Sequence, residues 1–161
     1  MANAQKSRCK LQPADYFVVL GVLSIAAGGI VSAIFAHEPG RFVMWAAAYL
    51  VLAAGLVQVA LGFLLKHLAP QNMERNLYTA VMLYNVGGLG VIAGTALKTS
   101  LVGPTVLVLA DAMFLLALLT IAYSVRTIRR SILLAFLYIL LAVLFVSTLV
   151  GLFLSTVIRL S

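Results

Sequence analysis

Apolar residues form five long stretches in the chain, and short polar breaks separate them. The stretches cover 16–36, 42–65, 77–97, 105–125 and 132–158. At about 1.5 Å per residue, a helix formed by any one of them spans the roughly 30 Å hydrocarbon core of a bilayer. The breaks carry Pro, Gly or charged residues, and none is long enough for a soluble domain. The pattern predicts an all-α, polytopic transmembrane helix bundle with five spans, in which residues 1–161 form a single integral membrane domain.

The composition strengthens this interpretation. Of the 161 residues, 64 % are hydrophobic and only 9 % are charged. Soluble domains are about half apolar and a quarter charged, and disordered chains have low hydrophobicity, so both classes are excluded. The fifth stretch is longer than a bilayer requires, and we expect that helix to tilt, to bend or to extend beyond the membrane.

The basic residues are distributed unevenly over the two sides that five spans define. Because cytoplasmic loops carry the excess of Lys and Arg, the bias predicts the N-terminus inside and the C-terminus outside, in a bacterial inner membrane. It also accounts for the net charge of +7 without a nucleic-acid partner. Trp45 and Tyr49 then fall near the outer interface as aromatic anchors, and the first span is too long for a cleaved signal peptide. The inner side carries Lys6, Arg8, Lys10, Lys66, Arg75, Arg126, Arg129 and Arg130, and the outer side carries Arg41, Lys98 and Arg159.

Small residues recur at helical spacing in four of the five stretches. In lipid, such residues mark the faces where helices approach closely. We expect these faces to hold the chain's own helices together; the alternative is that one of them contacts another chain. They are Ser24, Gly28 and Ser32; Gly55 and Gly62; Gly87, Gly90 and Gly94; and Ser147, Gly151 and Ser155.

The third stretch carries two different faces. At 100° per residue, Gly87, Gly90 and Gly94 lie roughly opposite Asn85. One face can therefore pack closely while the other presents an amide. This arrangement predicts that the third helix lies in the middle of the bundle, between two partners.

Three polar residues fall within the apolar stretches and form the candidate intramembrane polar site: Asp111, Asn85 and Gln58. A carboxylate near mid-membrane costs roughly 2.5–3.5 kcal/mol on insertion scales, so Asp111 must face the bundle, a cavity or another subunit. One interpretation is an interhelical hydrogen bond between Asn85 and Asp111, which lie at similar estimated depths in neighbouring stretches. The other is a carboxyl group that binds a proton or cation in a transport pathway.

The side chains needed for catalysis or cofactor binding are sparse. His37 and His67 fall on opposite sides of the predicted bundle, which disfavours a bis-histidine haem, and Cys9 is the only cysteine. We find no metal-ligand cluster, no paired carboxylates and no nucleophile–base pair. We therefore expect no catalytic, cofactor-binding or metal-binding residues. This inventory favours a protein that is not an enzyme over the alternative of a membrane enzyme that uses a partner's cofactor.

These observations favour an accessory or assembly subunit of a larger inner-membrane complex. Its partners would be the lipid bilayer and either other membrane subunits or copies of itself. Residues 84–95 are similar to Asn- and Gly-containing helices of respiratory oxidase subunits, although this pattern is generic for membrane helices and identifies no family. The alternative is a small homo-oligomeric transporter, linked to protons or cations, that uses Asp111.

Overall fold

The computed structural model describes residues 12–37, 40–68, 74–97, 100, 102–128 and 131–160, with the side chains of the last helix described to residue 153. All regular structure in these ranges is helical. The elements are α1 (Pro13–Ile34), α2 (Arg41–Val51), the π-helical turn η1 (Leu52–Leu56), α3 (Val57–Leu68), α4 (Glu74–Ala96), α5 (Gly103–Val125) and α6 (Ile132–Leu160).

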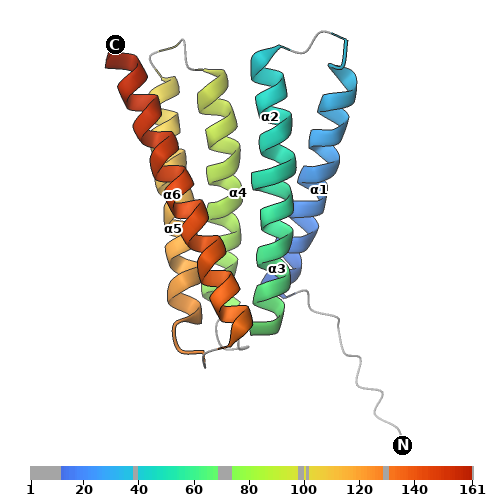
Figure 1. Cartoon of the computed structure of the whole chain (residues 1–161), viewed down its shortest axis with the longest axis vertical. Coiled ribbons are helices and arrows are strands. Elements are labelled where there is room, and N and C mark those ends of the chain that lie inside the picture. The colour runs from blue at the N-terminus through green and yellow to red at the C-terminus, as the bar shows by residue number, and fades with distance from the viewer. Residues whose placement is uncertain are drawn as a thin grey trace, which may run out of the picture.

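The prediction of five apolar helices is confirmed. Five segments are long and apolar enough to cross a membrane, because α2, η1 and α3 follow one another without a break. Helix α1 begins at one end of the bundle, and α6 ends at the opposite end (Figure 1). The five segments are Pro13–Ile34, Arg41–Leu68, Glu74–Ala96, Gly103–Val125 and Ile132–Phe153.

The helices pair into two hairpins. In the first, α1 packs along α2, η1 and α3; in the second, α4 packs along α5 (Figure 1). Glycines make both contacts close. A Cβ atom on Gly28 would lie 2.9 Å from the Ala47 carbonyl oxygen, and one on Gly62 would lie 2.8 Å from the Ala14 carbonyl oxygen. Most real Cβ atoms do not come this near a neighbour, so larger residues there would push α1 away.

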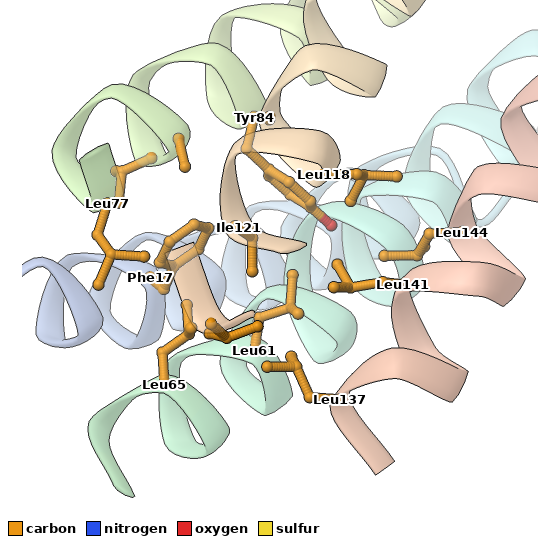
Figure 2. Close-up of a cluster of buried hydrophobic side chains, with 14 of the residues drawn as sticks. Phe17, Leu61, Leu65, Leu77, Tyr84, Leu118, Ile121, Leu137, Leu141 and Leu144 are labelled. Carbon is orange, nitrogen blue, oxygen red and sulfur yellow. The ribbon is translucent and has the colours of Figure 1, made fainter. Parts of the chain in front are cut away.

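The hydrophobic core lies toward the end of the bundle where α1 begins. There, side chains from both hairpins and from α6 meet in one cluster (Figure 2). It takes residues from the start of α1, the end of α3, the first half of α4, the second half of α5 and the first half of α6. Its largest members include Phe17, Leu61, Leu65, Leu77, Tyr84, Phe114, Leu118, Ile121, Leu137 and Leu141.

Helix α6 crosses the bundle at an angle to the other helices, as its length predicts (Figure 1). Its buried residues, Leu134, Leu137, Leu141 and Leu144, all belong to its first half. From residue 145 to 153 no side chain is buried. Among the described side chains, the burial of α6 is therefore concentrated in its first half.

A polar contact joins the two ends of the first hairpin. The Lys66 ammonium group donates to Asp15 Oδ1 at 2.7 Å, and the Gln12 backbone N–H donates to Asp15 Oδ2 at 3.0 Å. Pro13 at the first helical position also favours a helix start here, since its missing N–H would have no partner in the helix. Asp15 thus caps α1 and ties it to the end of α3.

Candidate functional site

Two of the predicted polar residues are brought into direct contact. Gln58 of α3 donates from Nε2 to Oδ1 of Asn85 in α4 at 3.1 Å. The bond links the two hairpins near the middle of their spans. Asn85 faces this partner while the glycines of α4 face α5, where a Cβ atom on Gly87 would lie 2.9 Å from the Ala110 carbonyl oxygen. The prediction that this helix lies between two partners is confirmed.

The hydrogen bonds fix which way both amide groups point. Asn85 Nδ2 donates to the Val81 carbonyl oxygen at 2.8 Å, so its Oδ1 must face Gln58. Gln58 then has to present Nε2 to that oxygen, because two carbonyl oxygens repel. Gln58 is fully buried, and its Oε1 has no hydrogen-bond partner among the described residues. A buried acceptor without a donor costs about 1–3 kcal/mol, so this oxygen is a strong candidate for ligand contact.

The π-helical turn provides a second polar contact between the hairpins. The Tyr84 hydroxyl group donates to the Ala53 carbonyl oxygen at 2.7 Å, and Ala53 lies within η1. A π turn widens the helix locally and often occurs at functional sites. The Tyr84 ring packs on Phe17 and Phe114, with centroid distances of 5.9 and 4.5 Å, so the hydroxyl group is held in place from two sides.

A cleft of about 330 Å³ lies beside these contacts, between α1, the second span and α4. Its lining is mostly apolar, and it is partly open: Leu23 and Leu89, which line it, are 59 % and 65 % exposed. The lining residues sit toward the middle of their helices, away from the ends of the five apolar segments. They are Leu20, Leu23, Ser24, Ala27, Tyr49, Leu50, Ala54, Gln58, Tyr84, Asn85, Gly88, Leu89 and Ile92.

The hydrogen bond expected between Asn85 and Asp111 is not formed, because the Asn85 amide faces Gln58 and the α4 face that packs on α5 carries the glycines. Asp111 lies half-buried on α5 and makes no hydrogen bond or ion pair with any residue that the structure describes. It interacts electrostatically with the hydroxyl group of Tyr49, which lines the cleft. The candidate site therefore divides into the Gln58–Asn85 pair and a separate carboxyl group, with Tyr49 near both.

Sequence reasoning missed the two tyrosines of this site. It placed Tyr49 near the outer interface as an aromatic anchor and did not connect it with the polar site. In the structure the side chain is half-buried, and its ring stacks on that of Trp45 with 5.4 Å between the ring centroids. Its hydroxyl oxygen lies 3.6 Å from where a Cβ atom on Gly88 would be. A signal for Tyr84 was available, because a tyrosine next to Asn85 in mid-span needs a partner for its hydroxyl group.

Some residues of the predicted small-residue faces are buried at helix contacts, and others are exposed. Gly28, Gly55, Gly62, Gly87 and Gly94 are buried at helix contacts, and Gly90 and Ser24 are half-buried. Ser32, Ser147 and Gly151 are exposed instead, and a Cβ atom on Gly151 would meet nothing within 4 Å. The side chain of Ser155 lies outside the described residues.

Within the described ranges, no group of three or more His, Cys, Asp or Glu side chains could hold a metal ion. Comparison of the chain with protein-family models, with curated proteins and with solved structures gives no match.

Proposed function

We propose that this chain is a non-catalytic accessory or assembly subunit of a larger inner-membrane complex. One observation carries the proposal: the carboxyl group of Asp111 lies half-buried in an apolar helix without a hydrogen bond from the described residues. Such a group is costly to leave facing lipid. A donor from a neighbouring chain would remove that cost, and assembly would then stabilise the subunit.

The exposed face of α6 supports the same conclusion. Ser147 and Gly151 lie four residues apart, both exposed, in the stretch from 145 to 153 where the structure shows no buried side chain. Small residues let two helix backbones approach closely, which is the main source of helix association in lipid. We propose that the second half of α6 packs against a partner helix.

Gentle extraction from native membranes, followed by native gels and mass spectrometry, tests the proposal. We expect a stoichiometric set of other membrane proteins. Gly151→Leu fits the free subunit, since nothing lies within 4 Å of its Cβ position, and should release the partners. Gly29→Leu is the matched control, because Gly29 of α1 is equally open. Recovery of this chain alone contradicts the subunit role. Equal loss of partners with both variants contradicts the assignment of the contact to α6.

The alternative proposal is a homo-oligomeric transporter linked to protons or cations. The polar side chains of Gln58, Asn85 and Tyr49 favour it, because they line one cleft, and Asp111 lies on α5, which packs along α4. Asp111→Asn separates the two proposals, since it keeps a hydrogen-bonding side chain but cannot titrate. An accessory subunit should keep its partners and its function with Asn and lose its partners with Leu. A transporter should form its oligomer with Asn but lose proton-coupled uptake in liposomes.

A further inference from the structure

We propose that the cleft between α1 and α4 binds a small, neutral, lipophilic alcohol or phenol that enters sideways from the bilayer. This goes beyond the subunit role and does not depend on it. Four features of the cleft carry the inference: its depth, its openness, its lining and the unpaired oxygen of Gln58.

The depth of the cleft determines where a ligand can come from. Leu23 and Ser24 lie at the middle of α1, Ala54 at the middle of the second span, and Asn85 at the middle of α4. Phospholipid headgroups stay at the bilayer surfaces, roughly 15 Å away in a 30 Å hydrocarbon core. A molecule that reaches this depth must therefore dissolve in the hydrocarbon.

The openness and size of the cleft suit such a molecule. Leu23 and Leu89 are exposed where they line the cleft, so an apolar molecule has a path from the lipid that crosses no polar surface. The volume of about 330 Å³ lies at the lower end of the range for small-molecule sites. No charged residue is part of the lining, which disfavours an ionic ligand.

Gln58 determines the polar group that the ligand must carry. Its Nε2 donates a hydrogen bond to Asn85 Oδ1, and its Oε1 is fully buried and has no hydrogen-bond partner among the described residues. Gln58 is one of the residues that line the cleft but is itself fully buried, so the donor group of a ligand there must displace the side chains that cover Oε1. This oxygen can only accept, and the ligand must therefore donate. A hydroxyl group is the neutral donor that adds least polarity to an otherwise apolar molecule.

The test measures competition for the site in purified full-length protein reconstituted in nanodiscs. The probe is tritiated para-propylphenol, and the competitors are unlabelled para-propylphenol and its methyl ether, para-propylanisole, which lacks the donor. We expect saturable binding, with the phenol competing about tenfold better than the ether, since one buried hydrogen bond of about 1.4 kcal/mol gives a factor of ten. Equal competition would mean that water satisfies Gln58 Oε1, and it would overturn the proposal.

Two variants locate the site. Gln58→Leu should bind the phenol and the ether equally; a preference that persists in this variant contradicts the role of Oε1. Ser24→Leu fills the cleft and should abolish saturable binding of the probe. Gly29→Leu adds the same side chain on an open part of α1 and should leave binding unchanged. If Ser24→Leu binds as tightly as Gly29→Leu, the cleft is not the site.

Discussion

The two faces of α4 pack in opposite ways. On one face, glycines bring the backbone of α4 against α5, and a Cβ atom on Gly94 would lie 2.9 Å from the Leu107 backbone nitrogen. On the other face, Asn85 reaches Gln58 through a side-chain hydrogen bond, and Gly88 lies beside a cleft. A Cβ atom on Gly88 would meet only the Tyr49 hydroxyl oxygen, at 3.6 Å.

This difference shows two ways in which apolar helices are held together, by close backbone packing and by side-chain contacts. Between α4 and α5, close backbone approach gives dispersion contacts along the whole helix. Between the two hairpins, contact is concentrated in the core cluster and in a few polar bonds, and space remains beside them. We infer that α4 and α5 form the rigid unit and that the hairpin interface is the part able to accept a ligand.

The largest effect on stability is expected for an alanine at Gly87, and its neighbour Gly88, on the other face of α4, serves as the control. Gly87→Ala places a methyl group 2.9 Å from the Ala110 carbonyl oxygen and 3.0 Å from the Phe114 nitrogen, and backbone atoms cannot move aside cheaply. We expect a loss of about 3 kcal/mol in the free energy of unfolding. Gly88→Ala makes only an ordinary contact and should change stability by less than about 0.5 kcal/mol. Detergent-induced unfolding of both variants measures this; equal values would contradict the difference between the faces.

Breaking the amide pair should have an intermediate effect. Asn85→Leu removes the acceptor of Gln58 Nε2 and leaves a second polar atom of that buried side chain unpaired. We expect a loss of about 1–2 kcal/mol. In the double variant with Gln58→Leu, part of this loss should be recovered, since neither polar group remains. A double-mutant cycle measures the coupling energy; strictly additive losses would show that the bond contributes nothing.

Removing one hydroxyl group from the hairpin interface should have a smaller effect. Tyr84→Phe keeps the ring packed on Phe17 and Phe114 but loses the bond to the Ala53 carbonyl oxygen. We expect a loss of about 1 kcal/mol. Amide hydrogen exchange should rise around η1 and stay constant in α5. A uniform rise over the whole chain would instead indicate global destabilisation.

The smallest effect is expected from the partly exposed ion pair that joins α1 to α3 within the first hairpin. Lys66→Ala removes the ion pair with Asp15, whose side chain is 24 % exposed while that of Lys66 is 52 % exposed. Exposed pairs contribute about 0–1 kcal/mol and are screened by salt. We expect a difference of less than about 1 kcal/mol at low ionic strength that disappears when salt is raised. An effect that is independent of salt would mean that the lysine stem stabilises by packing.

The sequence predicted a good part of the candidate site. The periodicity of α4 placed Asn85 opposite the glycines, and the helix does lie between two partners. Gln58 and Asn85 were both expected to be polar sites in the membrane, but their direct bond depends on how the two hairpins are placed relative to each other. Asp111 remains apart from the pair, because its neighbours are fixed by the rotation of α5, which no single-helix pattern gives.

The number of helices, their extents and the glycine face of α4 follow from the sequence, because hydropathy and residue spacing act along one helix at a time. The tertiary structure decided the cleft, the unpaired Gln58 oxygen, the half-buried position of Tyr49 and the lack of buried side chains from 145 to 153 in α6. They depend on contacts between helices far apart in the chain. In an apolar environment nearly every face of these helices is hydrophobic, so hydrophobicity alone cannot specify which faces meet.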